Sequence, residues 1–303
     1  MSDPFVIETS DLRKQYGEVQ ALRGLNLQVP AGSIYGFLGR NGAGKTTTIK
    51  VLLGMARPTS GSARVFGLPA DAPDASVDIR RRIGFVGDEK DLYAYMTVDE
   101  MIRFTAAFFP RWRADLEQRY VRAFDLPQSR KVKSLSRGTR TKLALLLALC
   151  RGAELLILDE PTSGLDPLMQ QAFYGLVREV TAAGRTVFLS SHLLAEVQHA
   201  ADRVAVIREG RLELVETVDV LRRRSFMRVE ATFAAPPPAD AFAGLSGVRE
   251  LERRGPVVLF SLEGPIDQLV KALARFEVLA LDVHEADLED IFLELYRGDG
   301  SAS

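Results

Sequence analysis

The chain has 303 residues, 47% of them hydrophobic and 26% charged, which is the composition of an ordinary globular protein with material for one large domain or two smaller ones. Its formal net charge of −1 provides no overall basic field, so we expect no nucleic-acid partner. The N-terminus shows no signal-peptide pattern, and apolar runs such as Leu143–Cys150 are far shorter than the roughly 20 residues that span a bilayer.

A strand is predicted over Ser33–Leu38. A glycine-rich turn and a predicted helix over Lys45–Met55 follow it. The turn matches the phosphate-binding pattern G-x-x-x-x-G-K-[ST], in which backbone amides and a helix N-terminus surround phosphate oxygens. Glycines are needed because a Cβ would obstruct that approach. We expect Lys45 to reach the β- and γ-phosphates of a nucleotide and the Thr46 hydroxyl to ligate Mg²⁺. The nucleotide-binding candidates are Gly39, Arg40, Asn41, Gly42, Ala43, Gly44, Lys45, Thr46 and Thr47.

A helical block is predicted from about residue 90 to residue 151, where it interrupts the alternation of strands and helices. Thr97 and Glu100, three residues apart, form a capping-box pattern that opens a helix extending to Phe109. Two further helices are predicted over Arg113–Phe124 and Arg140–Cys150.

Two side-chain patterns in this block predict core packing. Phe104 and Phe108 are four residues apart, so they share one helix face, and we expect that face to be buried. Cys150 is the single cysteine of the chain and ends an apolar run. It is therefore expected to be a small core residue of a protein from a reducing compartment.

Two acidic residues end a strongly apolar predicted strand, Leu155–Asp159 followed by Glu160. Asp159 is placed to hold Mg²⁺ through water, and Glu160 is placed to polarise an attacking water as a general base. Ile83–Gly87 and Thr186–Ser190 predict two more buried strands. The alternation of such strands with helices predicts an α/β fold with a mostly parallel sheet.

The character of the chain changes after about Arg224, which indicates a second domain. The predicted order there is βαββαβ with one more helix, an α+β arrangement. We predict a nucleotide-binding domain over residues 1–224, an accessory domain over 225–298 and a disordered tail over 299–303. The elements expected in the accessory domain are a strand Phe226–Phe233, a proline-rich stop Ala234–Pro238, a short helix, strands near Val248–Arg253 and Val257–Leu262, a helix Ile266–Phe276, a strand Val278–Val283 and a helix Leu288–Tyr296.

Taken together, these motifs resemble those of the ABC ATPases, the ATP-binding subunits of ABC transporters, over about residues 5–220. Such ATPases have a P-loop NTPase fold with an inserted helical subdomain. Leu135–Thr139 lies where that family has its Leu-Ser-Gly-Gly-Gln signature. Two subunits of the family close head to tail on two ATP molecules, so the resemblance implies a signature that acts on the nucleotide of the second subunit through Ser136, Arg137 and Gly138.

The resemblance also implies three further roles. His192 matches the histidine that contacts the γ-phosphate, and Tyr16 matches the aromatic residue that stacks on adenine. The segment expected to touch the partner subunit consists of Ser163, Gly164, Leu165 and Asp166.

Two segments depart from the family pattern. The first glycine and the glutamine of the signature are replaced by Arg137 and Thr139, and Asp88 stands where the family has a glutamine. An aspartate can still accept a contact from a Mg²⁺-bound water, so the predicted metal contacts are Thr46, Asp88 and Asp159.

The expected function is that of an ATP-hydrolysing subunit that dimerises on MgATP and drives a separately encoded permease, as in bacterial export systems. The chain would lie at the cytoplasmic face of the membrane, beside a second nucleotide-binding subunit that is a copy of itself or a paralogue. In such transporters the helical insert receives a helix of the permease, and Tyr93, Tyr95 and Phe109 either line that groove or pack in the core. Two alternatives stay open: a soluble ABC ATPase of translation or DNA repair, and a regulatory subunit that senses ATP without hydrolysing it.

Overall fold

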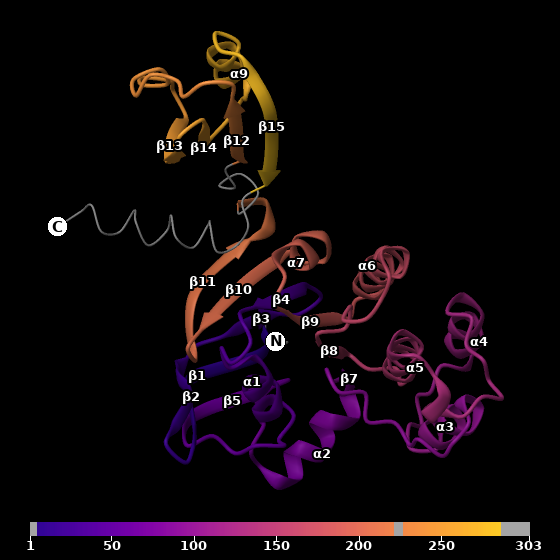
Figure 1. Cartoon of the computed structure of the whole chain (residues 1–303). Coiled ribbons are helices and arrows are strands. Elements are labelled where there is room, and N and C mark those ends of the chain that lie inside the picture. The colour runs from indigo at the N-terminus through magenta and orange to yellow at the C-terminus, as the bar shows by residue number, and fades with distance from the viewer. Residues whose placement is uncertain (1–4, 221–226, 286–303) are drawn as a thin grey trace. The chain divides into compact units, whose positions relative to one another are not determined.

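A computed structural model describes residues 5–220 and 227–285, and these residues belong to two compact units (Figure 1). The first unit is Met1–Val218 and the second is Asp219–Ser303. The predicted domain boundary after residue 224, the predicted helix Leu288–Tyr296 and the predicted tail 299–303 lie outside the described residues.

A six-stranded sheet forms the centre of the first unit, in the order β11-β10-β4-β9-β8-β7. The pairs from β10 to β7 are parallel, and β11 joins the edge as an antiparallel strand. Every residue of β4, β8 and β9 is buried, which explains why these strands are almost continuously apolar in the sequence. The bounds are β4 Ile34–Leu38, β7 Ile83–Val86, β8 Leu155–Asp159, β9 Thr186–Ser191, β10 Arg203–Arg208 and β11 Arg211–Thr217.

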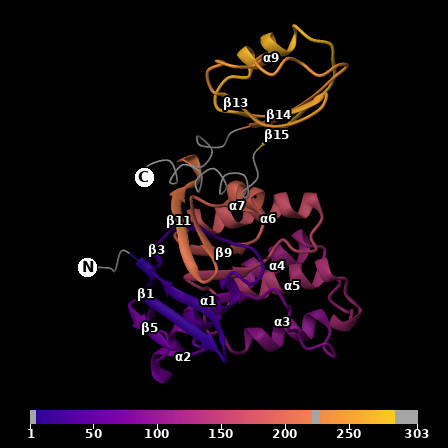
Figure 2. The same ribbon diagram turned by 60° about the vertical axis from the view of Figure 1, so that its left-hand side comes forward.

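A second sheet of the first unit is antiparallel and is built around β1, which pairs with β2, β3 and β5. Figure 2 shows β1 and β5 at one side of the unit and α3, α4 and α5 at the other. One apolar core joins the two sheets through side chains such as Ile7, Phe37 and Ile157. The bounds are β1 Phe5–Tyr16, β2 Val19–Leu25, β3 Gln28–Pro30, β5 Ser60–Val65 and β6 Leu68–Pro69.

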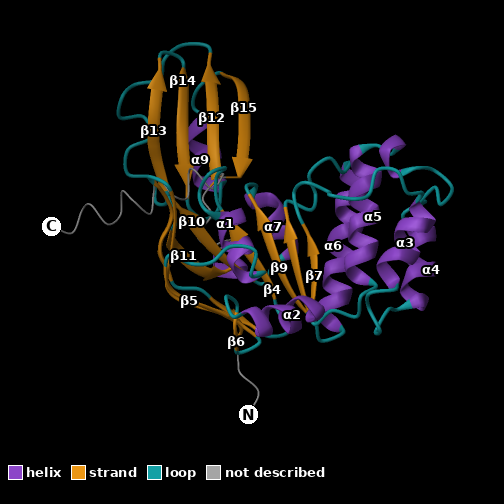
Figure 3. Ribbon diagram, turned by 90° about the horizontal axis from the view of Figure 1, so that it is seen from below, coloured by secondary structure: helices purple, strands orange, loops and turns teal. Residues whose placement is uncertain are grey.

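Helices α3, α4 and α5 form the predicted helical block, which lies beyond the β7 edge of the parallel sheet (Figure 3). The capping box of α3 is confirmed, because the Thr97 hydroxyl accepts from the Glu100 amide and the Glu100 carboxylate accepts from the Thr97 amide. The helix ends at Ala106, three residues before the predicted end. The bounds of the helices are α1 Lys45–Leu52, α2 Pro73–Arg82, α3 Val98–Ala106, α4 Ala114–Ala123, α5 Arg137–Leu149, α6 Pro167–Ala182 and α7 Leu194–Ala200, with a 3₁₀ turn Val132–Ser134.

Helix α5 is the apolar centre of this block, and Cys150 follows its last residue. Cys150 is fully buried, as expected, and burial raises the pKa of its thiol to about 12. The thiol therefore stays protonated at physiological pH.

The expectation that Phe104 and Phe108 pack in the core is wrong. Phe104 is 38% exposed and Phe108 is 64% exposed. The Phe104 ring instead contacts the rings of Phe108 and Tyr93, and the Tyr93 ring contacts that of Tyr95. These four residues form an exposed aromatic row on the helical block. Helical spacing gave the correct shared face but could not show that this face lacks a covering element within the described chain.

The second unit is a four-stranded antiparallel sheet in the order β13-β14-β12-β15, with α9 and its own apolar core. The predicted short helix after the proline-rich stop is absent: residues 239–247 consist mainly of turns. Gly244 and Gly247 have left-handed φ angles of 77° and 71°, and the turn places the Phe242 ring against Phe260. The bounds are β12 Met227–Phe233, β13 Val248–Arg254, β14 Val257–Leu262, α9 Asp267–Leu273 and β15 Val278–Glu285.

Candidate functional site: a nucleotide-binding centre

The glycine-rich turn connects β4 to α1 and has the conformation that the sequence motif requires. Gly42 and Gly44 have φ angles of 83° and 112°, which side chains rarely adopt. A Cβ on Gly39 would come within 2.4 Å of the Ile207 carbonyl oxygen. Residues 40–42 of the turn and Thr46 are exposed, and Thr47 is half-buried. Ala43 and Gly44 are buried. The turn thus presents backbone at a helix N-terminus.

Lys45 is folded into this turn and is only 5% exposed. Its Nζ donates a hydrogen bond of 2.5 Å to the carbonyl oxygen of Gly39 and lies 3.3 Å from Oε1 of Glu160. A buried ammonium group needs such partners because burial without them is costly. The structure thus brings Lys45 and Glu160, which are 115 positions apart, into direct contact.

Asp159 lies at the carboxyl end of β8 and is 2% exposed. Its two carboxylate oxygens have different donors: Oδ2 accepts from the Thr46 hydroxyl at 3.1 Å, and Oδ1 accepts from the Ser190 hydroxyl. Thr46 and Asp159 are therefore adjacent, as expected for two groups that share a metal ion. Hydroxyl and carboxylate oxygens suit Mg²⁺, which keeps several waters and phosphate oxygens among its ligands.

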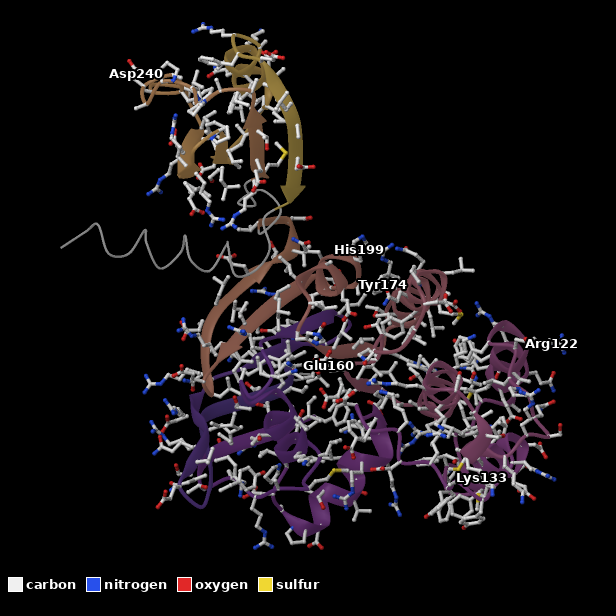
Figure 4. All side chains as sticks on the ribbon, viewed as in Figure 1. Arg122, Lys133, Glu160, Tyr174, His199 and Asp240 are labelled. Atoms are coloured by element: carbon white, nitrogen blue, oxygen red, sulfur yellow. The ribbon has the colours of Figure 1, made fainter. Side chains whose placement is uncertain are left out.

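Glu160 occupies the turn after β8 in a strained backbone conformation. Its φ angle is 48°, a left-handed value that costs a non-glycine residue on the order of 1–3 kcal/mol. Its amide donates to the Ser190 carbonyl oxygen at 3.2 Å, and its Oε2 lies 2.8 Å from Nδ1 of His192. In Figure 4 the Glu160 side chain lies near the ends of β8 and β9. This backbone geometry directs the carboxylate toward both Lys45 and His192.

The signature segment lies at the start of α5, which begins three residues earlier than predicted. Ser136 is the N-cap: its hydroxyl accepts from the Thr139 amide at 3.1 Å. Arg137 makes contacts that the sequence did not predict, since it donates to the Ser163 hydroxyl at 2.8 Å and lies 3.7 Å from Oδ1 of Asp88. Two of the three positions that depart from the family pattern, Arg137 and Asp88, thus contact each other within one chain.

The segment 163–166 packs closely against the signature. A Cβ on Gly138 would lie 3.0 Å from the Gly164 carbonyl oxygen, so the close approach favours glycine. Leu165 is 8% exposed, and the Asp166 carboxylate caps α6 by accepting from the Met169 amide at 2.9 Å. Ser163 and Gly164 are therefore the part of this segment that faces α5.

Tyr16 ends β1 and is 45% exposed, with Nζ of Lys14 lying 4.7 Å from its ring centroid. An exposed ring at this place is compatible with stacking on a base, and the adenine contact stays a prediction. The His199 ring stacks on that of Tyr174, at 5.7 Å between centroids (Figure 4).

Sequence reasoning missed two polar residues of this centre, Ser190 and Lys90. Ser190 holds Asp159, and Lys90 donates to the Gly87 carbonyl oxygen at 2.6 Å. Burial lowers the pKa of the Lys90 ammonium group, and the nearby carboxylates of Asp88 and Asp159 partly oppose that shift. No motif marks these residues, and only the fold brings them to the carboxyl ends of the parallel strands.

Comparisons with known proteins agree with this geometry. Residues 22–163 match the sequence profile described as ABC transporter. The bacitracin transport ATP-binding protein BcrA of Bacillus licheniformis is 34% identical over 97% of this chain and 98% of its own length. The daunorubicin/doxorubicin resistance ATP-binding protein DrrA of Streptomyces peucetius is 34% identical over 95% of this chain and 92% of its own.

Solved structures lead to the same family. The structure of an ATP-binding subunit of an ABC transporter matches with a TM-score of 0.66 and 30% identity, covering 72% of this chain and 92% of that one. The predicted fold class, a P-loop ABC ATPase cassette with a helical insert, is confirmed. Among residues 5–220 and 227–285, no helix is both long and apolar enough to cross a membrane. The chain belongs to the ABC transporter family, as one of its ATP-binding subunits and an ABC ATPase.

Proposed function

We propose that this ATPase dimerises on MgATP, hydrolyses it and thereby drives a separately encoded permease. The observation that carries the proposal is the cluster of Lys45, Glu160 and His192, with contacts of 3.3 Å and 2.8 Å. Lys45 would bind the β- and γ-phosphates. Phosphate oxygens would then replace Glu160 as its partner, which leaves Oε1 of Glu160 able to accept a proton from the attacking water.

Mg²⁺ fits the donors that this chain offers. The Thr46 hydroxyl and the Asp159 carboxylate are adjacent hard oxygen ligands beside the phosphate turn. A bound Mg²⁺ would neutralise charge on the β- and γ-phosphates. Ser190 would keep the Asp159 carboxylate oriented. Asp88 would contact a water bound to Mg²⁺ only after its carboxylate turns away from Arg137, with which it pairs in this structure.

The signature segment supports a composite site between two subunits. Ser136 and Arg137 are exposed, and the hydroxyl of Ser136 bonds locally to Thr139. The N-terminus of α5, a helix of 13 residues, adds a partial positive charge at this surface. Ser136 and Gly138 would therefore bind the γ-phosphate of ATP held by Lys45 of the other subunit.

The exposed aromatic row supports a permease partner. Tyr95 and Phe108 are 65% and 64% exposed, and large exposed aromatic clusters mark binding surfaces. Phe108 also lines a cavity of about 740 Å³ together with Phe109, which lies beneath the guanidinium of Arg151. An amphipathic helix of the permease would fit this surface. The chain would then lie at the cytoplasmic face of the membrane.

Export is the proposed direction of transport. The relatives are named for bacitracin transport and for daunorubicin/doxorubicin resistance, and resistance to a drug is consistent with its removal. The direction would be tested by reconstituting the chain with its permease in vesicles and measuring which side accumulates substrate on addition of MgATP.

The composite site can be tested by mixing two inactive variants, Lys45→Ala and Ser136→Arg. A mixed dimer holds one site with an intact Lys45 and an intact Ser136, so ATPase activity should partly return on mixing. A mixture no more active than either variant, although it still dimerises on ATP, would contradict composite sites. Absence of ATP hydrolysis by the wild-type chain would instead favour the ATP-sensing alternative.

A further inference from the structure

A buried carboxylate that no motif identifies lies behind the proposed catalytic pair. Glu196, on α7, is 7% exposed. Its Oε2 accepts from the Ser191 hydroxyl at 2.5 Å, and its Oε1 accepts from the Thr162 hydroxyl. The Ser191 hydroxyl in turn accepts from the Leu193 amide at 3.0 Å.

The two hydroxyl partners of Glu196 lie close in the chain to the proposed catalytic pair: Thr162 is in the turn after β8, and Ser191 is the last residue of β9. Thr162 is two residues after Glu160, and Ser191 is one residue before His192. The carboxylate of Glu196 therefore bridges the turn after β8 and the carboxyl end of β9. The residues that follow these two strands, Glu160 and His192, meet in a contact of 2.8 Å.

Helix α7 holds Glu196 in a fixed place. Val197 packs so closely on β4 that a Cβ on Gly36 would come within 2.2 Å of its side chain. Leu194 and Ala200 are also buried, so this face of the helix is otherwise apolar. Burial of a carboxylate is costly, and an apolar residue would serve packing better. The polar side chain at this position thus needs a reason other than packing.

We propose that Glu196 is a positioning residue for hydrolysis, which sets the relative placement of Glu160 and His192 by linking the turn after β8 to the end of β9. The proposal rests on the catalytic roles proposed above for those two residues. The left-handed backbone of Glu160 makes such a tie necessary, since a strained conformation persists only when its surroundings fix it. The Glu196 carboxylate would act through its hydrogen bonds with Thr162 and Ser191.

The test compares Glu196→Met, which keeps the side-chain length but leaves both hydroxyls without their acceptor, with Glu196→Gln. Glu196→Met should lower kcat by roughly 10- to 100-fold, as expected for a small misplacement of catalytic groups, while MgATP affinity changes little. Glu196→Gln should retain most of the rate, because its amide can accept from one hydroxyl and donate to the other. Ser76→Ala removes a buried hydroxyl that bonds to Pro73 and serves as the stability control.

A second background separates positioning from general support of the fold. In Glu160→Gln, measured in single turnover, Glu196→Met should cause little further loss, because the group that it positions is already absent. An equal loss in both backgrounds, or the same loss with Glu196→Gln, would overturn the proposal. A wild-type rate for Glu160→Gln alone would instead overturn the base assignment.

If Glu196→Met does not fold, Thr162→Val and Ser191→Ala answer the same question. Each removes one hydroxyl from the bridge, so each should lower kcat with little change in MgATP affinity, and both losses should shrink in the Glu160→Gln background. Wild-type kcat in both variants would overturn the proposal as well.

Discussion

The phosphate-binding centre and the signature segment belong to one cassette, yet their side chains are held in opposite ways. Lys45, Asp159 and Glu160 are nearly buried and contact partners of their own chain, with side-chain exposures of 13% or less. Arg137 and Asp88 have exposed side chains, at 65% and 53%, and meet only at their tips. The contacts of the first region hold its side chains within one chain, whereas the second region leaves its charged groups exposed, as the proposed composite site requires.

This difference predicts how mutations should act in each region. Removing one partner of a buried ion pair strongly lowers stability, and in this centre it would also remove a group proposed to be catalytic. An exposed ion pair contributes about 0–1 kcal/mol and is weakened by salt. Variants of the buried centre should therefore fail in chemistry, and variants of the signature segment should fail mainly in events that need two subunits.

The largest effect is expected for Glu160→Gln. Loss of the proposed general base should slow hydrolysis by roughly 10²- to 10⁴-fold while MgATP binding is retained. The ATP-bound dimer should then accumulate, which size-exclusion chromatography would detect. Glu154→Gln is the matched control, because Glu154 precedes the same strand and pairs with Arg82. Equal rates of hydrolysis by Glu160→Gln and the wild type would contradict the role of Glu160 as the general base.

An intermediate effect is expected for Ser136→Ala. Loss of an N-cap costs about 1 kcal/mol of stability. Thr97→Ala removes the N-cap of α3 in the same helical block and should cost a similar amount. Only Ser136→Ala should also reduce ATP-dependent dimerisation and hydrolysis. Thermal melts and ATPase assays of both variants would check this, and equal activity losses would mean that Ser136 is no more than a cap.

A smaller effect is expected at the Asp88–Arg137 contact. Asp88→Gln should lower the ATPase rate by about two- to fivefold at low salt, the range expected for an exposed ion pair. That loss should fall in an Arg137→Gln background and at high ionic strength, where the Debye length is short. If Asp88→Gln costs the same in both backgrounds, Asp88 acts separately from Arg137, as its proposed metal contact would require.

The smallest effect is expected from removing the second unit. The first unit has its own core around the two sheets, and the second has a separate core around Phe233 and Phe260. A fragment of residues 1–220 should therefore fold and bind MgATP with unchanged affinity. Calorimetric titration would measure this. An insoluble fragment, or one that does not bind ATP, would show that both regions depend on the second unit.

The sequence predicted which residues come together at the buried centre, because the parts of this centre follow local rules. A glycine-rich turn between a strand and a helix has few possible conformations, and an apolar run ending in Asp159 identifies a central strand. The capping box of Thr97 is equally local. Parallel strands then bring their carboxyl ends to one edge, so residues far apart in sequence meet there.

Contacts between unrelated loops could not be predicted in the same way. Nothing in the sequence pairs Arg137 with Asp88, or Glu196 with Thr162, because no spacing rule links them. The exposed position of Phe108 depends on which element covers α3, and the turns that replace the predicted helix depend on Phe242 reaching its core. Local patterns set the elements, and tertiary packing decides which faces are covered.

The buried thiol of Cys150 has a practical consequence for measuring subunit closure. It is the only cysteine of the chain, and a protonated, inaccessible thiol reacts slowly with alkylating reagents. A cysteine introduced on the surface, for example at Gln171 on α6, would therefore be the sole site of labelling without removal of the native residue. Pairs of fluorophores or spin labels attached there would report the distance between two cassettes directly, before and after nucleotide is added.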